Sequence, residues 1–233
     1  MENIIELAGI TKNYASIKAL NAVDLSLPKG KIIGLLGPNG SGKSTMIKIL
    51  TGIIKDFKGD VKVDGKKIGI YTKSIVSYLP DSTFFPEWMK VIEAISLFKD
   101  MYFDFDDVKA LEILGKFSIY PNMVIKSMSK GTKEKFQLIL TMSRKAKVII
   151  LDEPIGGVDP AAREVILKII LENFNDDQTV IIATHLIADI EQIFDQVVFI
   201  KDGIVVLNKD VEELRTETNK SVDELFREEF RCY

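Results

Sequence analysis

The segment from Gly37 to Ser44 has the spacing of a phosphate-binding loop, with two glycines, a lysine and a serine in the pattern G-x-x-x-x-G-K-S. An apolar run, Lys31 to Leu36, precedes it, and a helical pattern, Ser44 to Leu50, follows it. Backbone N–H groups of such a loop can surround a phosphate chain at the positive end of the helix. A glycine-rich turn without a ligand is the alternative, but both flanking elements favour phosphate binding.

The side chains of this loop are expected to divide the contacts to a nucleoside triphosphate. Lys43 would contact the β- and γ-phosphates, and the Ser44 hydroxyl would bind Mg²⁺. The residues expected to bind the phosphates are Asn39, Gly40, Ser41, Gly42, Lys43, Ser44 and Thr45.

Two adjacent carboxylates, Asp152 and Glu153, follow the apolar run Val148 to Leu151. They therefore lie at the carboxyl end of a predicted strand, where open α/β sheets bind ligands. Asp152 would hold Mg²⁺, directly or through water, and Glu153 would orient and deprotonate an attacking water. Capping of the turn at Pro154 is the alternative, which the phosphate-binding loop makes less favourable.

Two further segments place polar residues at the ends of predicted elements. Ser129-Lys130-Gly131 precedes a helical pattern, and His185, the only histidine, follows the strand-like run Thr179 to Thr184. Taken alone, the first is an ordinary helix start and the second an ordinary packed histidine.

The composition excludes several classes of protein. Lys and Arg number 31 and Asp and Glu 34, so that the net charge is -3, and no basic block suggests direct nucleic-acid binding. A single cysteine, Cys232, excludes an intrachain disulfide and a cysteine-based metal site. No apolar run approaches the roughly 18 residues of a membrane-spanning helix, and no basic region opens a signal peptide. We therefore expect a cytoplasmic chain with no membrane span of its own.

The elements that must position these residues alternate along the chain. Strands are expected at 2–8, 22–27, 31–36, 59–64, 75–79, 147–151, 179–183 and 196–200. The later runs are mostly apolar, as in a parallel sheet buried on both faces. Helical spacing dominates 84–145, which predicts a helical subdomain, and 209–233 forms a C-terminal helical extension. The sequence thus predicts an α/β fold in a single domain, 1–233.

Together, the phosphate-binding loop, the Ser129-x-Gly131 element, the Asp152-Glu153 strand end and His185 resemble the ATP-binding subunit of an ABC (ATP-binding cassette) transporter. The resemblance spans essentially the whole chain. It implies a P-loop ATPase core with a mostly parallel sheet, an N-terminal antiparallel β subdomain and a helical subdomain. It also implies a homodimer, or a pair with a related ATPase subunit, that encloses two ATPs head to tail and hydrolyses them with Mg²⁺.

The resemblance assigns roles to individual residues. Ser129 and Gly131 would bind the γ-phosphate of the ATP held by the second subunit, and Asp159 lies in the loop that crosses the dimer interface. His185 would contact the γ-phosphate and Glu153. Tyr14 matches the aromatic residue that stacks on adenine.

Two departures from the family pattern affect these assignments. Met128, Lys130 and Thr132 replace three residues of the usual Leu-Ser-Gly-Gly-Gln signature. Asp81 stands where transport subunits commonly have a glutamine that contacts Mg²⁺ and relays the partner's motion. A carboxylate suits Mg²⁺ as a hard oxygen ligand, so Asp81 is expected to bind the metal. These replacements resemble Gram-positive peptide, antibiotic and lipid exporters.

The resemblance also implies a separate transmembrane permease as partner, with this chain bound peripherally on the inner face of the membrane. The aromatic segment Phe84 to Met89 would either receive the permease or be buried in the helical subdomain. The amphipathic stripe at Ser221 to Phe230 would pack on its own domain rather than bind a partner. Alternatives are a soluble ABC-class ATPase of ribosomes, DNA or protein assembly, and a small-molecule kinase, which would leave the Ser129 element unexplained.

Overall fold

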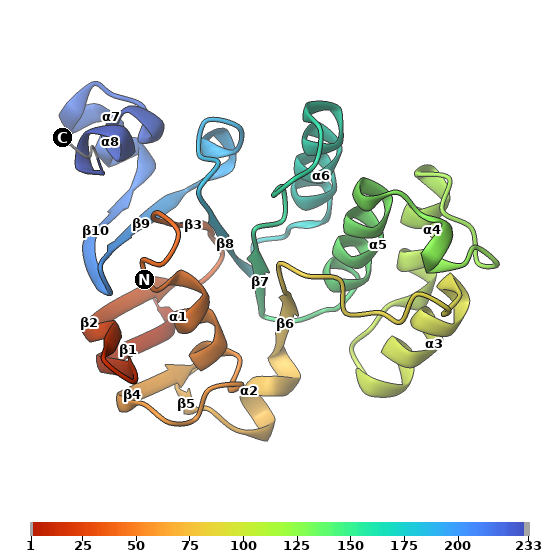
Figure 1. Ribbon diagram of the computed structural model, residues 1–233, viewed down its shortest axis with the longest axis horizontal. Helices are drawn as coiled ribbons and strands as arrows, with labels where there is room; N and C mark the ends of the chain where they lie inside the picture. The colour runs from red at the N-terminus through yellow and green to blue at the C-terminus, as the bar shows by residue number, and fades with distance from the viewer. Residues whose placement is uncertain (1, 231–233) are drawn as a thin grey trace.

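Two β-sheets form the centre of the structure, a computed structural model that describes residues 2–230 (Figure 1). Cys232, to which the sequence assigns no role, lies outside these residues. The antiparallel sheet has the order β2-β1-β4-β5 and comprises β1 (Asn3–Tyr14), β2 (Ile17–Pro28), β4 (Lys58–Val63) and β5 (Lys66–Lys67). The second sheet has the order β10-β9-β3-β8-β7-β6 and comprises β3 (Ile32–Leu36), β6 (Val76–Leu79), β7 (Val148–Asp152), β8 (Thr179–Thr184), β9 (Gln196–Lys201) and β10 (Ile204–Asp210).

The six-stranded sheet is parallel except for its edge strand β10. Strands β3, β7 and β8 are buried along their whole length, because other elements cover both faces. One face packs in a core with the antiparallel sheet and α1 (Lys43–Leu50). The other face packs with α6 (Pro160–Asn173), the helical subdomain and the C-terminal helices. The predicted α/β class with a mostly parallel sheet is confirmed.

The carboxyl ends of the parallel strands gather the chemistry-bearing loops at one edge of the sheet. The strand β3 ends at Leu36 before the phosphate-binding loop, β6 at Leu79 before Asp81, β7 at Asp152 and β8 at Thr184 before His185. Since β6, β7, β8 and β3 lie side by side in that order, residues far apart in the sequence meet there.

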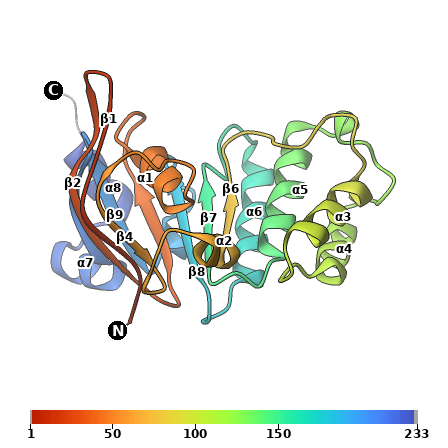
Figure 2. The same cartoon turned by 90° about the horizontal axis from the view of Figure 1, so that it is seen from below.

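The helical subdomain extends from the sheet on the side opposite the antiparallel sheet (Figure 2). It contains α3 (Val91–Met101), α4 (Asp107–Lys116), a short 3₁₀ helix (Ile125–Ser127) and α5 (Lys130–Met142). An aromatic cluster fills its core: the Phe85 ring centroid lies 5.7 Å from that of Phe98 and 5.4 Å from that of Phe136.

A buried guanidinium joins this subdomain to the sheet at the end remote from the loops. Arg144 is 3% exposed. It donates to both carboxylate oxygens of Asp104, at 3.0 and 3.1 Å, and to the carbonyls of Ser74 and Val76, each at 2.7 Å. Its guanidinium also lies over the Tyr102 ring, 3.9 Å from the centroid. Four of its five N–H donors are thus used, which offsets much of the cost of burying the charge.

Some elements differ from the expected bounds. The strand predicted at 2–8 continues to Tyr14. The sequence pattern does not show this extension, because register shifts after Leu7 and after Ile10 interrupt the alternation of side chains. The pattern did not reveal β5, β10 or the helix α2 (Ile70–Ile75), whereas α7 (Val211–Thr218) lies within the expected C-terminal helical extension at 209–233.

The C-terminal helix α8 (Val222–Glu229) begins after the N-cap Ser221, whose hydroxyl accepts from the Glu224 N–H. Phe226 and Phe230 pack on Phe199 of β9, which confirms that the stripe packs on its own chain. Within residues 2–230, no helix is long and apolar enough to cross a membrane.

Candidate functional site

The loop between β3 and α1 forms an open cradle of backbone. Gly40 and Gly42 have φ angles of +82° and +114°, a conformation that side chains disfavour. A Cβ at Gly42 would lie 2.6 Å from the Ala19 carbonyl, so only glycine fits this close approach. Gly42 is also the N-cap of α1 and supplies no side chain to the free N–H groups of the first turn. Those groups therefore remain available for an anion.

Lys43 lies in the same cradle with its ammonium turned onto the loop. Its Nζ donates to the carbonyls of Gly37 at 2.6 Å and Pro38 at 3.1 Å. Burial lowers the pKa of Lys43, and the negative charges of Glu153 and Asp152 partly oppose this shift. A partly desolvated cation held beside a row of free N–H groups suits the binding of a phosphate chain.

Asp152 is 2% exposed at the end of β7. Burial, with smaller contributions from the nearby charges of Asp81 and Glu153, raises the pKa of its carboxyl from 3.8 to about 6. The Ser44 hydroxyl bonds with the carboxyl and acts in the opposite direction. One oxygen, Oδ1, is buried without a hydrogen-bond partner among residues 2–230. Such an orphaned acceptor is costly unless a cation or donor occupies the space in front of it.

Glu153 is bound by two residues from the end of β8. Its Oε1 lies 2.9 Å from His185 Nδ1, and its Oε2 accepts from the Thr184 hydroxyl at 3.1 Å. Glu153 has a φ of +50°, an uncommon backbone conformation for a residue other than glycine. Its own N–H is held by the Ala183 carbonyl at 2.8 Å. Strained residues held in place by surrounding bonds are typical of functional sites.

A cavity of about 240 Å³ joins these groups. Its lining comprises Tyr14, Ala19, Asn39, Gly40, Ser41, Gly42, Lys43, Ser44, Thr45, Asp81 and Glu153. The structure thus brings the expected phosphate-binding loop, Tyr14, Asp81 and Glu153 together. Tyr14 is 45% exposed at the end of β1, and the Lys12 ammonium lies 5.1 Å from its ring centroid, so the exposed part of the ring can receive a flat ligand.

Three expected site residues lie elsewhere in the subunit. Ser129 is the N-cap of α5, where its hydroxyl accepts from the Thr132 N–H at 3.2 Å, and Gly131 lies in the first turn of that helix. Asp159 is the N-cap of α6 and accepts from the Ala162 N–H at 2.9 Å. Gly131 lies close to α6, since a Cβ at Gly131 would lie 3.7 Å from the Cβ of Ala162. These residues form a separate surface at the starts of α5 and α6.

Sequence reasoning missed two polar residues beside the site. Thr184 precedes His185 directly, so its position at a strand end could have indicated its contact with Glu153. Gln137 lies on α5, is 3% exposed and accepts from the Phe84 N–H at 3.0 Å. It therefore ties the segment after Asp81 to α5, a link that no local sequence pattern indicates.

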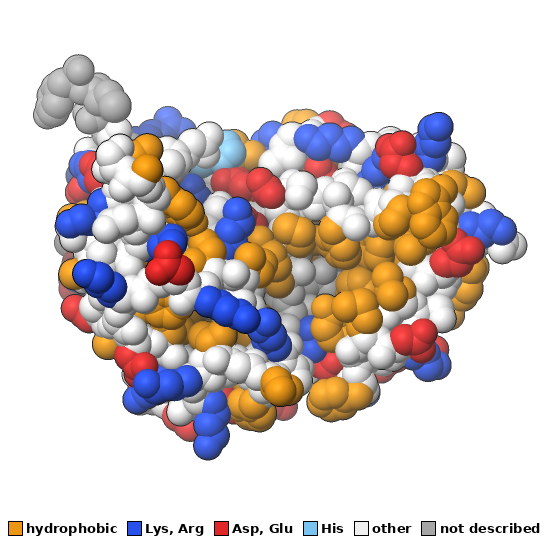
Figure 3. Space-filling model, turned by 60° about the horizontal axis from the view of Figure 1, so that its bottom comes forward, with side chains coloured by type: hydrophobic (Ala, Val, Ile, Leu, Met, Phe, Trp, Pro, Cys, Tyr) orange, Lys and Arg blue, Asp and Glu red, His pale blue; other side chains and the backbone are white. Residues whose placement is uncertain are grey.

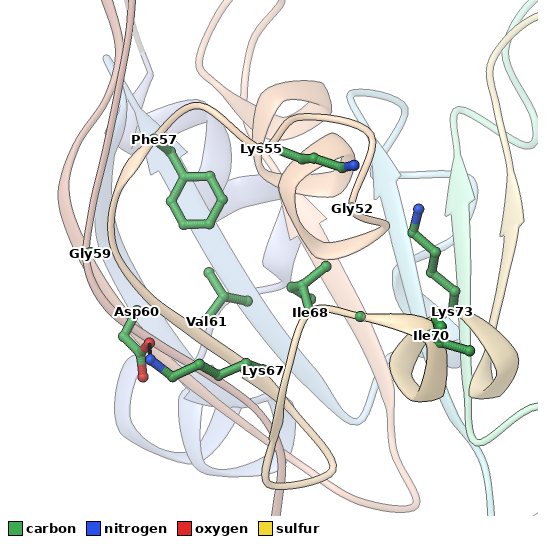
Figure 4. A pocket seen from close by; sticks show the side chains of 11 residues that line it. Gly52, Lys55, Phe57, Gly59, Asp60, Val61, Lys67, Ile68, Ile70 and Lys73 are labelled. Atoms are coloured by element: carbon green, nitrogen blue, oxygen red, sulfur yellow. Dashed lines mark ion pairs between the residues drawn. The ribbon is translucent and has the colours of Figure 1, made fainter.

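Another cavity, of about 550 Å³, lies at the far end of α1 and contains none of the expected site residues (Figure 4). Lys55 and Lys73 extend beside Gly52, while Lys67 pairs with Asp60 at 2.8 Å. The carbonyls at the C-terminal end of a helix carry partial negative charge and favour nearby lysines. This charge accounts for the lysines near Gly52 without a ligand.

Comparison with known proteins identifies relatives of the chain. Residues 20–156 match the family model described as ABC transporter. An uncharacterized ABC transporter ATP-binding protein of Methanocaldococcus jannaschii is 32% identical over 223 residues, which cover 92% of this chain and 80% of the relative. The lantibiotic transport ATP-binding protein SrtF of Streptococcus pyogenes is 28% identical over 233 residues, with 96% of each chain covered.

A solved structure agrees with these sequence relatives. It is cbiO1 of Clostridium perfringens, part of the ABC transporter complex cbiONQ, with 25% identity and a TM-score of 0.77. The match covers 99% of this chain and 96% of that protein.

Proposed function

This chain belongs to the ABC transporter ATP-binding subunits, which hydrolyse ATP for a membrane partner, and we propose that the cavity between β3, β7 and β8 is its ATP site. The observation that carries this proposal is the single cavity shared by the phosphate-binding loop and Glu153. Lys43 and the free N–H groups of α1 bind the β- and γ-phosphates. Tyr14 stacks on the adenine at the open side of the cavity.

The donor set beside Asp152 fits Mg²⁺. Hydroxyl and carboxylate oxygens are the ligands that Mg²⁺ prefers, and Ser44, Asp81 and Asp152 supply them. The orphaned Oδ1 of Asp152 fits a cation held in front of the carboxylate. Mg²⁺ held by these residues would supply positive charge to the phosphate oxygens.

Glu153 is the general base of the proposed reaction. One carboxylate oxygen takes a proton from water as that water attacks the γ-phosphate, and ADP leaves. His185 and Thr184 hold the carboxylate from the β8 side, which fixes its direction. The strained backbone of Glu153 serves the same positioning.

Two subunits complete the site in our proposal. Ser129 and Gly131 lie outside the cavity of their own subunit, at the N-terminus of α5, where N–H groups and a hydroxyl suit an anion. The γ-phosphate held by one copy therefore meets the Ser129 region of the second copy, with Asp159 at the interface. ATP favours this closed pair over ADP because only ATP provides the bridging phosphate.

The permease binds in a hollow between the helical subdomain and the region of β4 and α2 (Figure 3). Hydrophobic side chains gather on the helical-subdomain side of this hollow in the same view. A cavity of about 260 Å³ there includes Phe84, Phe85 and Met101 in its lining. Phe85 is buried within the subdomain, whereas Phe84 and Trp88 are 42% and 72% exposed. The exposed pair can serve as aromatic anchors.

The whole chain acts as one ATP-binding domain on the inner face of the membrane, held there by the permease. The helical subdomain covers about 84–145 and the C-terminal extension about 209–233. Export is the proposed direction, because Asp81 and the Lys130 within the signature element resemble the corresponding residues of peptide, antibiotic and lipid exporters.

Glu153→Gln tests the proposed site. The amide cannot accept the proton as a base, so we expect ATP hydrolysis to fall at least about 100-fold, while ATP binding persists and dimers accumulate. The measurements are phosphate release, ATP titration, and sedimentation with ATP or ADP. If the Glu153→Gln variant hydrolysed ATP at the parent rate, Glu153 would not be the general base. Copurification with the product of an adjacent permease gene tests the partnership separately.

A further inference from the structure

Lys130 occupies the first turn of α5 between the two residues assigned to the partner's γ-phosphate. Its side chain is 68% exposed, and Nζ lies 3.8 Å from Glu134 Oε1, one turn along the same helix. The contact is at the outer limit of an ion pair, and an exposed pair of this kind contributes little stability. The ammonium is therefore held only weakly in the single subunit.

The surroundings place this ammonium at the edge of the catalytic region. A cavity of about 230 Å³ is lined by Lys130, Glu134 and Gln137 of α5 on one side, and by Asp81 and Glu153 on the other. The Lys130 ammonium also covers Gly157, since a Cβ there would lie 2.1 Å from Nζ. Gly157 precedes the α6 cap Asp159, so Lys130 lies on the surface formed by the starts of α5 and α6.

Glu134 is an incomplete partner for this cation. Its Oε2 is buried without a hydrogen bond to any residue that the structure describes. Burial raises the pKa of the Glu134 carboxyl, and the charge of Lys130 only partly opposes the shift. A γ-phosphate carries more negative charge and more acceptor oxygens than this carboxylate, so it is the stronger partner for an ammonium.

We propose that the Lys130 ammonium binds the γ-phosphate of the ATP held by a second copy of this chain, and that Glu134 holds the ammonium until the two copies meet. The inference rests on the proposed head-to-tail pairing through Ser129 and Gly131. The flexible four-carbon stem of lysine lets Nζ reach a phosphate bound by the neighbouring Ser129 hydroxyl. Lys130 would thus add a charge contact that a glycine at this position cannot make.

The test compares variants in the Glu153→Gln background, where closed dimers accumulate. Sedimentation with Mg-ATP gives the dimer dissociation constant, and ATP titration at low protein concentration gives the affinity of the single subunit. We expect Lys130→Gln to weaken dimerisation at least about tenfold, the equivalent of one charge-assisted hydrogen bond, with unchanged single-subunit affinity. Lys135→Gln, which removes the same charge from the same helix, is the matched control and should leave dimerisation unchanged.

Glu134→Gln distinguishes a direct contact between the Lys130 ammonium and the phosphate from a purely structural role of Lys130. It releases the ammonium, so dimerisation should strengthen, and the gain should shrink when Lys130→Gln is also present. Raised salt should weaken dimerisation of the parent more than that of Lys130→Gln.

Equal dimerisation of Lys130→Gln and its parent, while Ser129→Ala dimerises poorly, would overturn the role of Lys130 alone. Normal dimerisation of Ser129→Ala as well would overturn both the head-to-tail pairing and the role of Lys130.

Discussion

His185 Nδ1 lies 2.9 Å from Glu153 Oε1, although 31 residues separate the two in the sequence. The two residues meet because β7 and β8 are parallel neighbours that end at the same edge of the sheet. The second oxygen of Glu153 is bound by Thr184, so the carboxylate has one fixed direction. The proposed base is therefore positioned by the end of a neighbouring strand.

His185→Ala should slow turnover at least about tenfold, because it frees one oxygen of the proposed base from its fixed position. ATP affinity should change little, since Lys43 and the α1 N–H groups remain. Steady-state phosphate release, with ATP titration alongside, separates the two quantities. Loss of affinity with an unchanged maximal rate would contradict a positioning role.

Lys43→Ala should weaken ATP binding at least about tenfold, because it removes the one cation among the described residues that line the proposed site. Lys48→Ala provides the control, since Lys48 lies exposed in the last turn of the same helix. A fluorescent ATP analogue can report both affinities. Equal losses in the two variants would indicate a general effect of charge on α1.

Gln137→Met should lower the free energy of unfolding by about 1 kcal/mol, because the Phe84 N–H loses its acceptor while the side-chain volume is nearly kept. The segment from Asp81 to Phe84 should also loosen, which would reduce stimulation of ATP hydrolysis by a bound permease. Urea denaturation and permease-stimulated turnover measure the two effects. If neither the free energy of unfolding nor the stimulated turnover changes, this hydrogen bond contributes to neither.

Asp64→Asn should destabilise the chain by an amount that depends on pH. Hydrogen bonds from Lys147 and Tyr71 lower the pKa of the Asp64 carboxyl from 3.8 to about 2. Because the folded state binds this proton more weakly, the stabilisation is fully present above about pH 4 and is lost as the pH falls towards 2. Asparagine tolerates the φ of +51° at this position, so mainly the charge is removed.

Urea denaturation at neutral pH should show a loss of about 1 kcal/mol in the Asp64→Asn variant. Near pH 3 the difference between variant and parent should be roughly half as large. A difference that does not change with pH would contradict an origin in the charge of Asp64.

The local part of the site could be predicted from the sequence, whereas the contacts between segments could not. The phosphate-binding loop is a continuous stretch whose glycines and lysine have a fixed spacing, and Asp152-Glu153 directly follows a recognisable strand. The Gln137–Phe84 hydrogen bond depends on how α5 packs against the segment after Asp81, which neither segment encodes alone. The true length of β1 was hidden because bulges interrupt its alternation.

Arg144 anchors the helical subdomain at the end of the sheet remote from the loops, so a rotation of the subdomain would turn about this point. It lies two residues beyond the end of α5, and Ser129 lies at the opposite end of that helix. A helix of 13 residues is about 20 Å long. Swinging α5 through about 10° around its anchored end would therefore carry Ser129 some 3 Å, roughly the length of one hydrogen bond. A rotation of this size would be enough to make or break contact with a neighbour's nucleotide.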